Sequence, residues 1–201
     1  SCFYDAVWGG RTELVRRLIK DGADVNERNG SSGDTALRVA VIRGNNPIIS
    51  ILLLNEADPD RGTSNGTSPM HMAAWKGSVQ QAQMLIAGAA DVSIVTNAGF
   101  TPLDYALRPP SVEMIRLLLN NGAFVDAQHP VTGATTLRHA VQATQHRPLA
   151  SRAAIGLLIE QGANVSAADI HGVTPLHITA IEKNRELLSL LLEKRAQYST
   201  R

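Results

Sequence analysis

The sequence predicts an all-α solenoid of helix–turn–helix repeats, and two recurring signals carry this prediction. A six-residue element, Thr174-Pro175-Leu176-His177-Ile178-Thr179 in its last copy, starts at positions 35, 68, 101, 135 and 174, which are 33, 33, 34 and 39 residues apart. A leucine-rich run closed by Gly-Ala or a variant recurs in step with it. Its closing pairs are Gly22-Ala23, Glu56-Ala57, Ala89-Ala90, Gly122-Ala123 and Gly162-Ala163. Two phased signals indicate that each repeat stacks on the next.

Each six-residue element predicts the start of the first helix of a repeat. In the last copy the Thr174 hydroxyl caps the helix, and Pro175 occupies the first position, where its missing N–H is not needed. The leucine-rich run predicts the second helix, which Gly22 or its equivalent ends in the left-handed conformation. Glu56 stands at that position without being glycine, so we expect about 1 kcal/mol of local backbone strain there.

The phased elements resemble the ankyrin repeat over essentially the whole chain. The residues that carry the resemblance most specifically are Asp169, Gly172, Thr174, Pro175, Leu176 and His177. The resemblance implies an ankyrin repeat array of about six repeats joined by β-turn fingers. We expect one domain over 1–201, with repeats near 1–28 (partial, an N-terminal cap), 29–61, 62–94, 95–127, 128–167 and 168–201 (a C-terminal cap). The fifth carries an insertion at 144–149, expected between its two helices as a second contact region.

Composition narrows the possible partners and compartments. The net charge is +1, with 19 basic and 18 acidic residues, which argues against nucleic acid. Cys2 is the only cysteine, which excludes an internal disulfide and favours an intracellular, cytoplasmic location, with the nucleus as the alternative. The longest apolar run, near Ile48 to Leu54, is too short to span a membrane. The first residue is not Met, which favours a piece of a larger multidomain chain, and the array is expected to be monomeric.

Motifs that might carry chemistry are explained by the fold. The resemblance implies that His71 and His177 tie a turn to neighbouring backbone rather than act in catalysis. Arg38, Asp104 and Arg138 replace them in the other repeats, so we expect a weaker turn network there. The sequence has no cluster of His, Cys, Asp or Glu residues with the spacing of zinc ligands, and no Gly-x-Ser-x-Gly motif of the kind that holds a hydrolase nucleophile. We therefore expect no catalytic residue, no metal and no cofactor.

What remains is the concave groove that the resemblance implies, lined by first helices and fingers. Residues three or four apart share one helix face, which gives one set of groove positions for every repeat. The candidate protein-binding residues are Trp8, Ile42, Arg43, Met72, Trp75, Lys76, Phe100, Tyr105, Arg108, His139, Gln142 and Ile181. Trp8, Ile42 and Trp75 should form an apolar stripe on consecutive helices, with Arg43, Lys76 and Arg108 beside it. For Trp8 the alternative is that it covers the end of the array.

Two functions are compatible with this groove. The first is a non-catalytic scaffold that binds a partner's helix, loop or peptide, with the three cations favouring an acidic or C-terminal segment. The second is an atypical enzyme or small-molecule binder with Asp5, Tyr105 and His139 as acid/base groups. The resemblance also implies possible hydroxylation of Asn26, against the simpler interpretation that Asn26 hydrogen-bonds its own turn.

Overall fold

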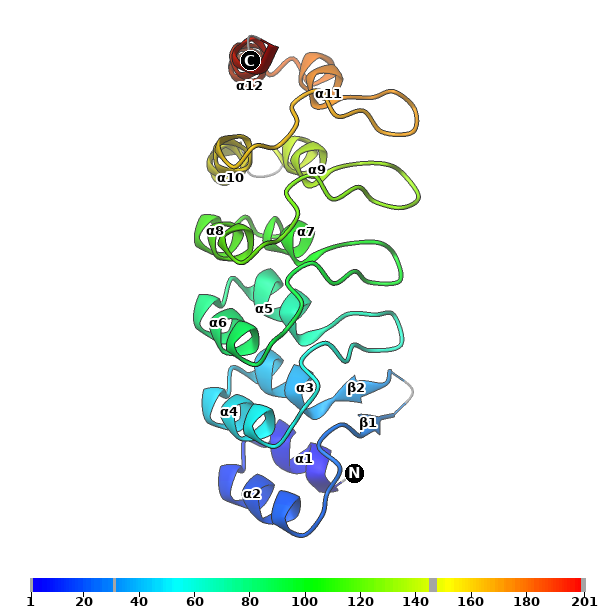
Figure 1. Cartoon of the computed structure of the whole chain (residues 1–201), viewed down its shortest axis with the longest axis vertical. Coiled ribbons are helices and arrows are strands. Elements are labelled where there is room, and N and C mark those ends of the chain that lie inside the picture. Colours follow the sequence, from blue (N-terminus) through cyan, green and yellow to red (C-terminus); the bar gives the residue numbers. More distant parts are fainter. Residues whose placement is uncertain (1, 31, 145–147, 200–201) are drawn as a thin grey trace. The chain divides into compact units, whose positions relative to one another are not determined.

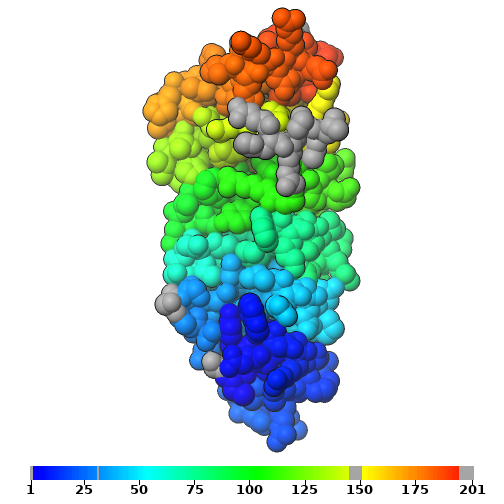
Figure 2. All heavy atoms as spheres, turned by 180° about the vertical axis from the view of Figure 1, so that it is seen from behind, coloured from blue at the N-terminus to red at the C-terminus, as the bar shows by residue number. Residues whose placement is uncertain are grey.

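A computed structural model describes residues 2–30, 32–144 and 148–199 and shows helix pairs that recur along the chain (Figure 1). The chain divides into two compact units, Ser1–Tyr105 (unit 1) and Ala106–Arg201 (unit 2). Within each unit, repeats follow one another in sequence order, seen as consecutive colour bands in the space-filling view (Figure 2). The predicted all-α repeat fold is confirmed.

Unit 1 begins with a helix pair in the repeat that was expected to be a partial N-terminal cap. Its first helices are α1 (Cys2–Trp8), α3 (Ala36–Arg43), α5 (Pro69–Lys76) and α7 (Pro102–Ala106), which ends at the unit boundary. Its second helices are α2 (Thr12–Lys20), α4 (Asn46–Leu54) and α6 (Val79–Ala87). Helix α3 packs on α1 and α5, and α4 packs on α2 and α6. Strands β1 (Arg28–Asn29) and β2 (Asp34–Thr35) pair antiparallel, with Asn29 opposite Asp34.

Unit 2 continues the same plan. Its helices are α8 (Val112–Asn120), α9 (Thr136–Ala143), α10 (Pro148–Glu160), α11 (Pro175–Ile181) and α12 (Arg185–Ser199). Helix α10 packs on α8 and α9, and α11 packs on α9 and α12. Of the predicted insertion at 144–149, Thr144 follows α9, residues 145–147 lie outside the described residues, and the last two residues belong to α10.

Side-chain caps start the first helices as the sequence predicts. The Thr35 hydroxyl oxygen accepts a hydrogen bond from the N–H of Arg38, three residues into the helix. The same cap recurs at Ser68, Thr101, Thr135 and Thr174. These caps satisfy backbone donors that a helix start leaves open, so each first helix begins at a defined residue.

The second helices of five repeats stop at a left-handed residue. Gly22, Gly122 and Gly162 have φ of 93°, 92° and 91° there. Glu56 is left-handed as predicted, with φ of 63°, and Ala89 takes the same conformation with φ of 65°. Two non-glycine residues therefore carry backbone strain at equivalent helix ends.

Backbone hydrogen bonds join the tips of successive fingers. The Ser64 N–H donates to the Ser32 carbonyl, and the Asn97 N–H donates to the Asn65 carbonyl, each at 2.9 Å. Gly66, with φ of 79°, allows this approach, because a Cβ there would lie 2.8 Å from the Asn97 nitrogen. In unit 2 the Ile170 N–H donates to the Thr132 carbonyl at 3.0 Å. The fingers are thus held in register without long strands.

The core of each unit is a strip of aliphatic side chains. The largest fully buried side chains are Leu37, Ile48, Ile49, Leu52, Met70, Leu85 and Leu103 in unit 1 and Met114, Ile115, Leu118, Leu137 and Ile155 in unit 2. Alanines such as Ala40 and Ala73 are completely buried in the first helices, because the helices need small side chains to approach each other closely. The tryptophans take no part in this core.

Candidate functional site

Three left-handed glycines set the register of the first helices of unit 1. Gly10, Gly44 and Gly77 have φ of 67°, 74° and 65° and follow α1, α3 and α5. Trp8, Ile42 and Trp75 each lie two residues before one of these glycines. Because the helices pack consecutively and end alike, the three side chains occupy equivalent positions. This equivalence follows the spacing of the three residues in the sequence.

Both tryptophans keep much of their surface in contact with solvent. Trp8 and Trp75 are each 49% exposed, and Ile42 between them is partly exposed. Exposing two large aromatic side chains gives up the free energy that their burial would contribute. We call Trp8, Ile42, Arg43, Trp75 and Lys76 the Trp8–Trp75 surface.

The two cations of this surface each reach back to the preceding repeat. The Arg43 guanidinium lies 5.2 Å from the ring centroid of Trp8, within cation–π range. Lys76 Nζ donates to the carbonyl oxygens of Ile42 at 2.8 Å and Val41 at 3.1 Å, in the last turn of α3. The carbonyls at a helix C-terminus carry partial negative charge and favour a cation. Lys76 therefore has a structural role that its sequence position did not reveal.

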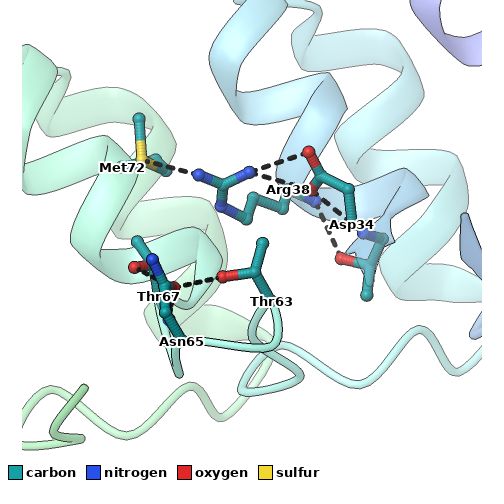
Figure 3. Close-up of polar contacts among 7 residues, drawn as sticks. Asp34, Arg38, Thr63, Asn65, Thr67 and Met72 are labelled. Atoms are coloured by element: carbon teal, nitrogen blue, oxygen red, sulfur yellow. Dashed lines mark hydrogen bonds and ion pairs between the residues drawn. The ribbon is translucent and has the colours of Figure 1, made fainter. Parts of the chain in front are cut away.

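Arg38 forms a network at the base of the first finger (Figure 3). Its Nη1 donates to both carboxylate oxygens of Asp34, at 2.8 and 2.9 Å, and its Nη2 donates to the Met72 sulfur at 3.3 Å. Both members of the ion pair are largely buried. Met72, predicted to line the groove, is thus a partly buried contact of Arg38 rather than a free apolar side chain.

His71 is buried and holds backbone of two successive repeats together. Its Nδ1 contacts the backbone N–H and the hydroxyl of Ser68, and its Nε2 lies 3.0 Å from the Phe100 carbonyl oxygen. Burial lowers the pKa of His71 and favours the neutral ring, against the raising effects of the Phe100 contact and Asp104. The predicted structural role of His71 is confirmed.

Tyr105 and Phe100 contribute to this structural cluster. The Tyr105 ring packs edge-on against His71, with centroids 4.9 Å apart at 70°. The Phe100 side chain is partly buried, and its carbonyl is the acceptor for His71. Asp5, the other polar group of the enzyme hypothesis that lies in unit 1, is exposed on α1. These contacts explain Tyr105 as a packing residue.

The predicted weakening of the turn network is wrong at Asp104, whereas Arg38 and Arg138 form ion pairs and do not reproduce the His71 contact. Asp104 Oδ2 accepts from both the N–H and the hydroxyl of Thr101 at 2.9 Å, which reproduces the cap made by His71. Arg38 pairs with Asp34, and Arg138 pairs with Asp169 of the following finger at 3.0 Å. A guanidinium has donors only, so Arg38 and Arg138 cannot accept the N–H of the cap residue as His71 and Asp104 do, and the Thr35 N–H donates to Asp34 Oδ1 instead.

The remaining predicted residues lie in unit 2. Arg108 was expected on one helix face with Tyr105, but α7 ends at Ala106, so Arg108 is exposed beyond the helix. Pro109 follows it, and a residue before proline disfavours helix. His139 lies on α9 with its ring 6.4 Å from that of His129. Gln142 and Ile181 are exposed near the ends of α9 and α11.

The Asn26 side chain also differs from its prediction. Its Nδ2 donates to the Glu56 carbonyl at 3.0 Å and its Oδ1 accepts from the Asp58 N–H at 2.7 Å. Asn26 therefore binds the turn of the next repeat, while Asp24 closes its own turn. Asp60 and Asp126 make the equivalent contact with Asp91 N–H and Asn164 N–H. These side-chain contacts form only where one repeat stacks on the next, so the sequence of a single repeat does not predict them.

The described part of the chain contains no group of three or more His, Cys, Asp or Glu side chains arranged to hold a metal ion. Among its helices, none has both the length and the apolar character needed to cross a bilayer.

Comparison with known sequences decides the family. The profile described as Ankyrin repeats (3 copies) matches residues 3–96 and 53–129, and the single Ankyrin repeat profile matches residues 171–199. The chain belongs to the ankyrin repeat family. Ankyrin repeats are generally protein–protein interaction modules, and ankyrin repeat domains are typically non-enzymatic scaffolds.

Solved ankyrin repeat structures resemble the whole fold. The ankyrin repeat domain of Bcl-3, described as a unique member of the IkappaB protein family, aligns with a TM-score of 0.87 at 27% identity, covering 96% of this chain and 86% of that chain. An ankyrin repeat domain (ABAYE2397) from Acinetobacter baumannii AYE aligns with a TM-score of 0.86 at 26% identity, covering 96% of each chain.

Similarity in sequence to two named proteins is confined to a short stretch. The human and bovine proteins called Mitochondrial disaggregase are 39% identical to this ankyrin repeat chain over 62 residues, or 31% of it. The matched stretch is 9% of the length of either disaggregase, so it covers a small part of those proteins.

Proposed function

We propose that this ankyrin repeat chain is a non-catalytic scaffold that binds a segment of a partner protein on the Trp8–Trp75 surface. The observation that carries the proposal is Trp75, which lies in an inner repeat and is still 49% exposed. Helices α3 and α6 pack on α5 and bury its apolar side chains, yet the indole of Trp75 is left outside this core. Half-exposed tryptophans and arginines are the residue types that dominate binding energy at protein interfaces.

The geometry favours an apolar anchor flanked by charge. Trp8, Ile42 and Trp75 are on consecutive packed helices, so a partner helix, loop or peptide can contact all three at once. Arg43 is held over Trp8, and Lys76 is held by the α3 carbonyls, so little conformational entropy is lost when a partner binds.

An acidic segment is the partner chemistry that this surface fits. The α3 C-terminus partly compensates the charge of Lys76. Arg43 is the cation placed beside both a tryptophan and solvent, and a carboxylate of the partner would pair with it. We propose that a monomeric array binds this partner inside the cell, in the cytoplasm or the nucleus. Cys2, a free exposed thiol, suits such a reducing compartment.

Unit 2 offers separate candidates. Gln142 and Ile181 lie two residues before Thr144 and Lys183, in the register that Trp75 has with Gly77. Ile181 is 77% exposed. We include both, with Arg108 and His139, as proposed partner contacts of that unit.

The test is affinity capture from a lysate of the source organism, with the parent chain compared with Trp8→Ala/Trp75→Ala. The matched control is Phe124→Ala/Val131→Ala, which also removes two exposed apolar side chains. Circular dichroism must show all three chains folded. A protein bound by parent and control but lost by the tryptophan variant supports the proposal. Equal capture by all three chains contradicts it.

A further inference from the structure

The second helices of unit 1 form a hollow that the proposed function does not use. It has a volume of about 390 Å³ and is lined by Arg16, Ile19 and Lys20 of α2 and by Ile51 and Asn55 at α4. The two helices lie side by side and are in contact (Figure 1). The volume lies within the range of roughly 300–1,000 Å³ typical of ligand pockets. The hollow therefore has the size to hold one residue of a ligand and its side chain.

Apolar side chains supply part of the lining. Ile51 is buried among the helices and Ile19 is partly buried. An aliphatic side chain of a ligand would remove this surface from water.

Two cations lie on one side of the hollow. Arg16 and Lys20 are four residues apart on α2 and so share a helix face. Arg16 Nε is 3.8 Å from a Glu13 oxygen, in a pair whose members are both well exposed, so that pairing is weak and exchangeable. Glu56 follows Asn55 directly and disfavours a ligand of high negative charge. The arrangement fits a single carboxylate, which Arg can bind through two hydrogen bonds.

Asn55 adds an acceptor. Its Nδ2 donates to the Ile51 carbonyl at 2.8 Å, which fixes the amide at the end of α4. The Oδ1 of that amide is then the atom that can accept from a ligand N–H. A fatty acid has no such donor, whereas the last residue of a peptide has one beside its carboxylate.

The repeat plan does not require this pair of cations. Counted back from the left-handed residue of each second helix, the positions of Arg16 are Ser50, Gln83, Arg116 and Gly156 in the other repeats. The positions of Lys20 are Leu54, Ala87, Asn120 and Glu160. Among these five second helices, α2 alone carries a cation at both positions. The pair is a local property of this surface.

We propose that the hollow between α2 and α4 binds the C-terminal residue of a partner polypeptide. Arg16 and Lys20 hold the terminal carboxylate. Asn55 Oδ1 accepts a hydrogen bond from the N–H of the last residue. Ile19 and Ile51 contact its aliphatic or aromatic side chain.

The experiment measures binding of the full chain to labelled six-residue peptides, Gly-Ser-Gly-Ser-Gly followed by Leu, Val or Phe, by fluorescence anisotropy. Each peptide is made with a free C-terminal carboxylate and as the C-terminal amide. At least one free acid should bind, and its amide should bind about tenfold more weakly, because a charge-assisted hydrogen bond is lost. Equal binding of acid and amide, or no binding of any acid up to about 1 mM, overturns the proposal.

Variants locate the binding. Arg16→Gln/Lys20→Gln should weaken binding of the free acid about tenfold or more. Arg116→Gln changes the equivalent residue of α8, and Arg17→Gln changes a neighbouring cation that pairs with Asp21, so both should bind like the parent. If either control loses as much affinity as the double variant, the effect is general charge and the proposal fails. Decanoate that displaces the peptide at equal concentration would replace the peptide assignment with a fatty acid.

Discussion

At the scale of single residues, imidazole and carboxylate side chains fill one turn position in the same way. His71 and His177 use an imidazole nitrogen to complete the cap of Ser68 and Thr174, and Asp104 uses a carboxylate oxygen for Thr101. All three give the cap residue's N–H an acceptor, so the backbone is satisfied in each case. His71 makes a second contact through Nε2, with the Phe100 carbonyl of the next finger. The histidine therefore adds a link between repeats to the cap.

His71 should make folding stability depend on pH. Burial lowers its pKa from the usual 6.5, so the unfolded chain binds a proton more readily than the folded chain. The stabilisation by neutral His71 is complete above about pH 6.5 and is lost as pH falls through the folded-state pKa. The unfolding free energy, measured with urea at about pH 7.5 and about pH 5.5, should therefore fall on acidification.

A matched variant isolates this histidine. In His71→Asn the amide oxygen can accept from the Ser68 N–H, as Asp104 accepts from Thr101, without titrating near neutral pH. The variant should lose less stability between the two pH values than the parent does. Equal losses in the two chains would show that His71 is not the titrating group.

At the scale of elements, some helix ends can be predicted from the sequence and others cannot. Gly22, Gly122 and Gly162 mark left-handed helix ends because glycine adopts that conformation without a steric penalty. The end of α7 was missed, although Pro109 and Pro110 follow it and disfavour helix at the preceding residue. A helix-face argument carried past Ala106 therefore placed Arg108 on a helix that had already ended.

Glu56 is a stabilisation target at the end of α4. Its φ of 63° is strained for a residue with a Cβ, and Glu56→Gly removes that strain while adding flexibility to the unfolded chain. The unfolding free energy from urea denaturation should rise by about 0.5–1 kcal/mol. The reverse control, Gly122→Ala, places a Cβ at φ of 92° and should lower it by at least that amount. A loss of stability in Glu56→Gly would mean that its side chain outweighs the backbone strain.

At the scale of the whole molecule, the period of the sequence predicts the repeated helices but not the contacts between repeats. The helix caps and the glycines that end helices can be predicted from the residues of each repeat taken by itself. The equivalent positions of Trp8, Ile42 and Trp75 follow in the same way from the place of each residue in its own repeat. The Arg43 contact with Trp8, the Lys76 bonds to α3 and the Asn26 bonds near Glu56 each join residues about one repeat apart. Which rotamer reaches across depends on the stacking distance, which the sequence period leaves open. The hollow between α2 and α4 was missed for the same reason.

Stacked repeats contact mainly their neighbours, so damage to one repeat should stay partly local. Both tryptophans lie in unit 1, so their fluorescence reports on that unit, whereas circular dichroism reports on all helices. Leu158 is fully buried in α10 of unit 2, and Leu158→Ala should cost about 2–5 kcal/mol. In urea, the dichroism transition should shift to lower concentration by more than the fluorescence transition.

The matched variant in unit 1 tests the same argument from the other side. Leu85 of α6 is also fully buried, and Leu85→Ala should shift the fluorescence transition at least as much as the dichroism transition. Opposite orders of the two probes in the two variants would mean that the units unfold with separate stabilities. If the fluorescence and dichroism transitions instead shift equally in both variants, the whole chain unfolds in a single cooperative transition. A loss of stability in either unit is then shared by the whole chain, because only such a transition moves both probes equally.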